Sequence, residues 1–92
     1  LNNVKRDKNM INVLFFAQIR ELLGTAQLSV EASEQTQTAE GLRATLAATD
    51  DKWAKVLASD KLLVAVNQTI SQWDTRVSDG DEVAFFPPVT GG

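Results

Sequence analysis

The chain has 92 residues, of which 43% are hydrophobic, so it is long enough for one small domain with a modest core. Its 12 acidic and 9 basic side chains give a formal net charge of -3, which offers no electrostatic reason to expect nucleic acid or an anionic membrane as a partner. The absence of cysteine and histidine excludes disulfides, thiolate metal sites and a cysteine nucleophile. Because the commonest metal ligands and the commonest general base are missing, we expect no metal site and no enzyme activity of the chain on its own.

Residues 1–9 are polar and are expected to form a flexible N-terminal extension. The apolar stretch after them, 10–17, is interrupted by Asn12 and is too short to span a bilayer. Polar and charged residues follow it instead of a small-residue cleavage site, which argues against a secretory signal. We therefore expect a cytoplasmic protein.

The alternation of residues 10–17 predicts a first strand. It assigns Ile11, Val13, Phe15 and Ala17 to one face, and Asn12, Leu14 and Phe16 to the other. Both faces are partly apolar, which suits a central strand or a strand whose second face meets another protein. A short helix over 18–23, ended by Gly24, and a half-buried strand over 25–32 are predicted next.

Thr38 is the predicted N-cap of the main helix, which continues to about residue 49. Gly41 lies inside this helix and is expected to weaken it by up to about 1 kcal/mol relative to alanine. A second, irregular helical turn is predicted over 50–57, where Trp53 is interpreted as a packing residue.

The last part of the chain is predicted to form strands over 62–66, 69–73 and 82–86, separated by turns at 67–68 and 77–81. In the final strand the alternation places Val83 and Phe85 inward and Ala84 and Phe86 outward. The whole order predicts one α+β domain over 10–86, with a mixed five-stranded sheet and one main helix across one face.

Two prolines, Pro87 and Pro88, should end the last strand at Phe86, because proline has no backbone N–H to donate to a sheet. They also stiffen the exit, so that residues 87–92 form an extended tail that could reach roughly 20 Å at about 3.3 Å per residue. This length suits insertion into a deep pocket of another protein.

The sequence ends in Gly91 and Gly92, which have no Cβ and would let a terminal carboxylate enter a narrow active site. A free carboxylate is a poor electrophile, so an enzyme would first have to convert it to an acyl adenylate with ATP. The alternative interpretation is a frayed C-terminus that happens to end in glycine.

Three stretches of the chain resemble the family of small, sulfur-carrier subunits of molybdopterin synthase, which are ubiquitin-like β-grasp proteins. They are residues 13–18 (VLFFAQ) with 20–22 (REL), residues 62–68 (LLVAVNQ) and residues 79–92 (DGDEVAFFPPVTGG). The last stretch is the most specific, because it combines the Asp-Gly-Asp turn, the Phe-Pro-Pro exit and the terminal Gly-Gly. The extension 1–9 and the weakly matching 34–60 depart from the family.

The resemblance implies that an ATP-dependent activating enzyme adenylates the Gly92 carboxylate and that a sulfur donor converts it to a thiocarboxylate. The tail would then enter the large catalytic subunit, where the sulfur is transferred to cyclic pyranopterin monophosphate to build the dithiolene of molybdopterin. The carrier would bind no cofactor of its own, and the synthase would be a heterotetramer of two small and two large subunits.

The resemblance also assigns roles to residues. Gly92 would carry the sulfur, Gly91 would keep the approach narrow, and Pro87, Pro88, Val89 and Thr90 would form the positioned arm. Phe16, Phe86 and Ile70 are the expected docking residues, because exposed apolar clusters are typical of interfaces, and Arg20 is the expected ion-pair donor at the rim. The alternative for Phe16 and Ile70 is an ordinary core position.

Other functions with the same fold stay open at this stage. A carrier for thiamine thiazole synthesis shares the Gly-Gly end, although the Phe-Phe-Ala-Gln and Arg-Glu-Leu segments argue against it. A conjugated ubiquitin-like modifier would end in an isopeptide bond from Gly92 to a lysine. A purely structural interaction domain would tolerate an extra residue after Gly92.

Overall fold

A computed structural model of the protein describes residues 10–88. The expected N-terminal extension, 1–9, and the tail residues Val89, Thr90, Gly91 and Gly92 lie outside the described residues. In chain order the elements are the strand β1 (Met10–Phe15), the helix α1 (Ala17–Leu23), the strand β2 (Gln27–Glu31), the short 3-10 helix η2 (Glu34–Thr36), the helices α2 (Ala39–Ala47) and α3 (Asp51–Leu57), and the strands β3 (Leu63–Val66), β4 (Thr69–Ser71) and β5 (Glu82–Phe86).

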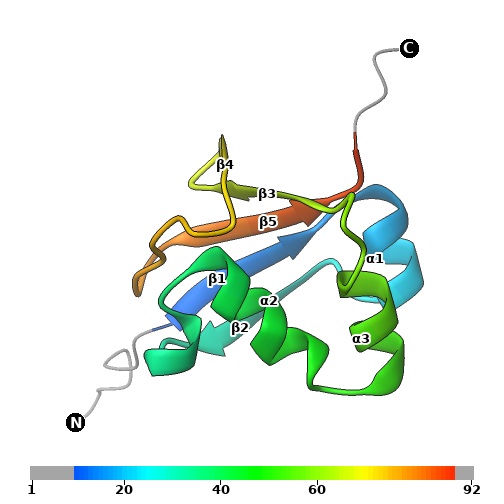
Figure 1. Cartoon of the computed structure of the whole chain (residues 1–92), viewed down its shortest axis with the longest axis horizontal. Helices are drawn as coiled ribbons and strands as arrows, with labels where there is room; N and C mark the ends of the chain where they lie inside the picture. The colour runs from blue at the N-terminus through cyan, green and yellow to red at the C-terminus, as the bar shows by residue number, and fades with distance from the viewer. Residues whose placement is uncertain (1–9, 89–92) are drawn as a thin grey trace, which may run out of the picture.

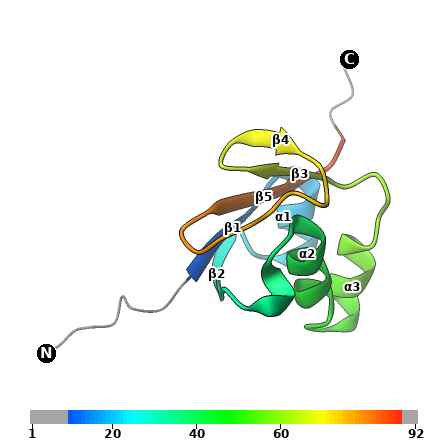
Figure 2. The same cartoon turned by 60° about the vertical axis from the view of Figure 1, so that its left-hand side comes forward.

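The strands form one five-stranded sheet in the order β2-β1-β5-β3-β4. The two central strands β1 and β5 are parallel, and the other three pairs are antiparallel. The helices lie on one side of this sheet (Figures 1 and 2). The predicted α+β fold with a mixed sheet is therefore confirmed, and α2 is accompanied on the covered face by α1 and α3.

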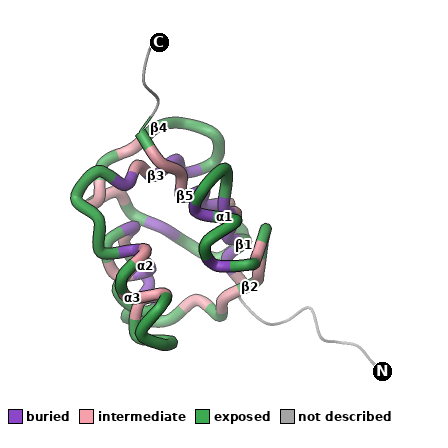
Figure 3. The backbone as a smooth tube through the Cα atoms, turned by 90° about the vertical axis from the view of Figure 1, so that its right-hand side faces the viewer, coloured by how far each residue is buried: buried purple, intermediate pink, exposed green. Residues whose placement is uncertain are grey.

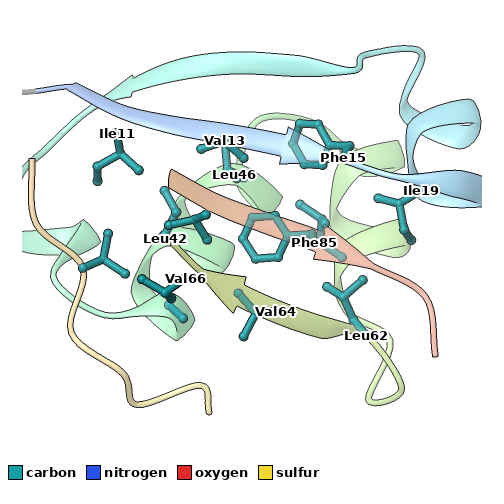
Figure 4. Close-up of a cluster of buried hydrophobic side chains, with 14 of the residues drawn as sticks. Ile11, Val13, Phe15, Ile19, Leu42, Leu46, Leu62, Val64, Val66 and Phe85 are labelled. Atoms are coloured by element: carbon teal, nitrogen blue, oxygen red, sulfur yellow. The ribbon is translucent and has the colours of Figure 1, made fainter. Parts of the chain in front are cut away.

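The core lies between this covered face and the helices. Alternate residues of the central strands, including Val13, Phe15 and Phe85, have at most 1% of their surface exposed and point toward Leu42 and Leu46 of α2 (Figure 4). The Phe85 ring stacks on both Phe15 and Trp73 with ring centroids 6.0 Å apart. Trp53 packs edge-on against Phe15 at 5.5 Å, which confirms its packing role.

The first strand is shorter than predicted. β1 ends at Phe15, and Ala17 begins α1 as an exposed residue with a φ of 54°, so the prediction of Ala17 as an inward strand residue was wrong. The chain turns here because Phe16 lies in the extended N-cap position and its carbonyl accepts a hydrogen bond from the Ile19 N–H, 3.1 Å. The alternation of apolar and polar residues alone placed the end of the first strand beyond Phe15, where it actually ends.

The main helix begins as predicted but its glycine has another role. The Thr38 hydroxyl accepts a hydrogen bond from the Gly41 N–H at 3.0 Å, which confirms the N-cap. A Cβ on Gly41 would collide with the carbonyl oxygen of Gln35 in the segment of η2. The glycine therefore allows η2 to lie against α2, which local helix propensity could not indicate.

The predicted irregular turn over 50–57 is the regular helix α3, capped by the Asp50 side chain, which accepts from the Trp53 N–H at 2.9 Å. The predicted strand 69–73 ends at Ser71. The chain then turns back over the start of α2, where the carbonyls of Trp73 and Thr75 accept from the N–H groups of Glu40 (2.8 Å) and Ala39 (3.0 Å). The last two predicted strand residues, Gln72 and Trp73, therefore lie outside the sheet: the Gln72 carbonyl accepts from the Thr75 N–H at 3.1 Å in a turn, and the Trp73 carbonyl serves the start of the helix.

Candidate docking site at the base of the tail

We call the sheet face opposite the helices the open face, and an apolar row crosses four of its strands. The register places Leu14, Ala84, Ala65 and Ile70 opposite one another across β1, β5, β3 and β4. Ile70 is 69% exposed, whereas the two alanines are 8% exposed or less. Ala84 therefore lies on the predicted outward face but is buried among its neighbours.

A second row of apolar residues follows at the end of the strands from which the tail leaves. Phe86 pairs with Leu63, and the Phe16 N–H donates to the Phe85 carbonyl at 3.2 Å, which holds Phe16 beside the end of β5. Phe16 is 45% exposed and Phe86 is half-buried. The alternative that Phe16 and Ile70 are core residues is therefore wrong, and their role in docking remains a prediction.

The last strand ends at Phe86, as the prolines predicted, with Pro87 half-buried and Pro88 exposed. The two prolines separate two hollows. The first, which we call the Phe16 groove, has a volume of about 440 Å³ and is lined by Phe16, Ala17, Phe86, Pro87 and Pro88. It continues the apolar second row of the open face to the base of the tail.

The second hollow, which we call the α1–α3 groove, lies on the helical side of the prolines and has a volume of about 390 Å³. Its lining comes from α1, from α3 and the loop after it, and from the tail base: Gln18, Ile19, Leu22, Lys55, Val56, Ser59, Lys61, Leu62, Pro87 and Pro88. Figure 3 views this end of the molecule, with α1 and α3 on either side.

Arg20 is exposed on α1 but does not line either groove. The ion pair found among residues 10–88 joins Arg43 to Glu40, with 2.6 Å between Nη2 and Oε1, and leaves the Arg20 guanidinium out. The predicted ion pair of Arg20 with a partner at the rim remains a prediction.

Sequence reasoning missed Leu22, which is 54% exposed and lines the α1–α3 groove. Leu22 lies three residues after the buried Ile19 on the same side of the helix, and the sequence contains no signal that only Ile19 is covered. Leu63 was also missed as an open-face residue, although its alternation with Leu62 and Val64 carried the signal.

The described residues present an exposed apolar surface beside Pro87 and Pro88. No group of three or more acidic side chains between Met10 and Pro88 is arranged to hold a metal ion. Nor does any helix in this part of the chain have the length and apolar character needed to cross a membrane. What the geometry provides is an exposed apolar face that leads to the point where the tail begins.

The fold defines a ubiquitin-like β-grasp protein, in which the central strand β5 is followed by Pro87 and Pro88. A Haloferax volcanii protein of known solution structure superposes with a TM-score of 0.73 at 26% identity, over 100% of this chain and 94% of that one. A protein in the complex of subunits 1 and 2 of molybdopterin-converting factor from Helicobacter pylori superposes with a TM-score of 0.63 at 26% identity, over 90% of this chain and 99% of that one.

The sequence comparisons are more specific. The profile of the ThiS family matches residues 13–92. The molybdopterin synthase sulfur carrier subunit of Escherichia coli (strain K12) is 57% identical over 83 residues, which cover 90% of this chain and 100% of that protein. The chain therefore belongs to the ThiS family, among its molybdopterin synthase sulfur carrier subunits.

Proposed function

We propose that this chain carries sulfur as a thiocarboxylate on Gly92 and delivers it to the large subunit of molybdopterin synthase. The carrier supplies the reacting carbonyl group and the surface that positions it, and the partner proteins supply the catalytic groups. Its own side chains are suited to this division, since the sequence contains neither cysteine nor histidine.

The chemistry runs in two steps on the terminal carbonyl. An activating enzyme joins the Gly92 carboxylate to the AMP part of ATP and releases pyrophosphate. A sulfur donor then delivers a sulfide equivalent to the acyl carbon, AMP leaves with the bonding electron pair, and a C–S bond replaces the C–O bond to AMP. In the large subunit the thiocarboxylate sulfur forms a C–S bond to a carbon of cyclic pyranopterin monophosphate and displaces an oxygen substituent there. Water then cleaves the acyl C–S bond and restores the Gly92 carboxylate, and two such transfers make the dithiolene.

The observation that carries the proposal is the end of β5 at Phe86, followed by Pro87 and Pro88 beside the exposed apolar Phe16. A protein that binds the open face is in position to receive the segment that follows Pro88. The identity with the Escherichia coli carrier over that protein's whole length supports the same assignment, as does the Helicobacter pylori complex of subunits 1 and 2.

Intact-protein and C-terminal peptide mass after coexpression with the activating enzyme and a sulfur donor tests the proposal. We expect a mass increase equal to the replacement of one oxygen by sulfur, located at Gly92. A variant lacking Gly92 is the control and should keep its mass. An unchanged mass of the wild-type chain, under conditions that convert the Escherichia coli carrier, would contradict the proposal.

A second test adds one alanine after Gly92. The extension moves the terminal carboxylate by about 3.3 Å, so we expect near-complete loss of thiocarboxylation and of molybdopterin formation. A purely structural interaction domain would keep its function. Complementation of strains that lack the carrier for molybdopterin or the carrier for thiamine thiazole then distinguishes the two sulfur pathways.

A further inference from the structure

The α1–α3 groove has no assigned role, although it shares its wall with the tail base. Pro87 and Pro88 line both this groove and the Phe16 groove, so the two hollows lie on opposite sides of the same short segment. A protein whose channel takes up the residues after Pro88 would lie next to that segment, within reach of the α1–α3 groove as well as the open face.

The charge of this groove is opposite to that of the chain. Lys55 and Lys61 line it and no Asp or Glu does, whereas the whole chain has a formal net charge of -3. Neither lysine takes part in the Arg43–Glu40 ion pair, which is the ion pair found within residues 10–88. The two ammonium groups are thus available to a carboxylate from another molecule.

The groove is also apolar between the lysines. Leu22 is 54% exposed here, and the half-buried Val56 and Pro87 complete an apolar lining. Covering such side chains removes apolar surface from water and stabilises a complex. An apolar side chain with a carboxylate nearby in the same segment matches this combination.

We propose that the α1–α3 groove is a second docking site for the large synthase subunit, and that it binds a rim segment presenting an apolar side chain to Leu22 and Val56 and an Asp or Glu to Lys55 and Lys61. This proposal rests on the proposed function, because it concerns the partner that receives the tail. The open face and the groove would then hold the tail base from both sides and limit the directions in which the tail can point.

Charge reversal tests the electrostatic part. Lys55→Glu should weaken binding to the cognate large subunit about fivefold, and Lys55→Glu with Lys61→Glu about tenfold or more, as measured by isothermal titration calorimetry at low salt. Lys52→Glu is the matched control, since it makes the same charge change on α3 at an exposed residue outside the groove. The difference between Lys55→Glu and Lys52→Glu should shrink at about 500 mM salt, where exposed charges are screened.

The apolar part is tested with Leu22→Ser, which should weaken the same binding about fivefold without changing the salt dependence. Circular dichroism of each variant checks that it is folded. Equal affinities of wild-type and groove variants would overturn the proposal, and so would an equal loss in Lys52→Glu. A groove that proves to join two copies of this chain, detected as a wild-type dimer that Leu22→Ser separates, would also overturn it.

The mass of Gly92 after activation keeps this test separate from the proposed function. If the wild-type chain becomes thiocarboxylated and binds the large subunit while the groove variants bind equally well, only the groove proposal fails. If the wild-type chain is not thiocarboxylated under conditions that convert the Escherichia coli carrier, the proposed function itself fails.

Discussion

The covered face and the open face of the sheet are made by alternate residues of the same strands, and Phe85 and Phe86 show the contrast most directly. Phe85 has none of its surface exposed and lies between Phe15 and Trp73. Phe86, the next residue, is half-buried beside Pro87 on the face that no described helix covers. Two neighbouring phenylalanines thus belong to two different surfaces.

The difference separates folding from binding. Apolar side chains on the covered face contribute to the free energy of unfolding, because they leave water when the helices pack on them. Exposed apolar side chains on the open face are left in water by folding, and only binding of another molecule would bury them. Substitutions on the two faces should therefore change different measured quantities, and the following predictions test that separation.

The largest effect is expected from Phe85→Ala, which removes a fully buried ring and leaves a cavity. We expect the free energy of unfolding to fall by about 3–5 kcal/mol. Urea denaturation followed by the fluorescence of Trp53 and Trp73 measures this loss. A loss below about 1 kcal/mol would mean that the core closes over the missing ring and that the contrast between the faces is weaker than the burial suggests.

The open face should give the reverse result. Ile70→Ser and Phe16→Ser should each weaken binding to the large subunit about tenfold or more, which corresponds to about 1.4 kcal/mol. The free energy of unfolding of Ile70→Ser should stay within about 0.5 kcal/mol of the wild-type value, because Ile70 is the more exposed of the two residues. Lys52→Ser, on α3 away from the sheet, is the control for binding. Unchanged affinities would remove the docking role from both residues.

Gly41→Ala tests how closely η2 packs against α2. Helix propensity alone predicts a gain of up to about 1 kcal/mol. The new Cβ would collide with the Gln35 carbonyl oxygen, so we expect a net loss of about 1–2 kcal/mol in thermal or urea denaturation. Ala44→Gly, at an exposed position of the same helix, should lose about 1 kcal/mol through propensity and provides the comparison. A stabilised Gly41→Ala variant would show that η2 can move away.

The smallest effect is expected at the start of α2. Thr38→Ala removes the hydroxyl that accepts from the Gly41 N–H, and the free energy of unfolding should fall by about 1 kcal/mol. Thr38→Ser keeps the hydroxyl and should recover most of the loss. If both variants lose the same amount, the methyl group of Thr38 rather than the cap is responsible.

Several features of the protein were determined by the sequence alone, because they depend on local chemistry. Prolines cannot donate to a sheet, so Pro87 and Pro88 ended β5 at Phe86. Thr38 can accept a hydrogen bond from a helix N-terminus, so it marked the start of α2. Alternation divided the strand residues correctly between two faces, as Val83 and Phe85 show.

Only the tertiary structure decided which of these faces the helices cover and what is left exposed. Periodicity specifies which residues share a face but not which element packs on it. For this reason the sequence did not decide whether Leu22 and Ile70 are buried or exposed. Helix propensity predicts only that Gly41 weakens α2, whereas the tertiary structure places the Gln35 carbonyl oxygen where a Cβ on residue 41 would lie. The two grooves beside Pro87 likewise arise where α1, α3 and the end of β5 meet, because segments distant in sequence form their walls.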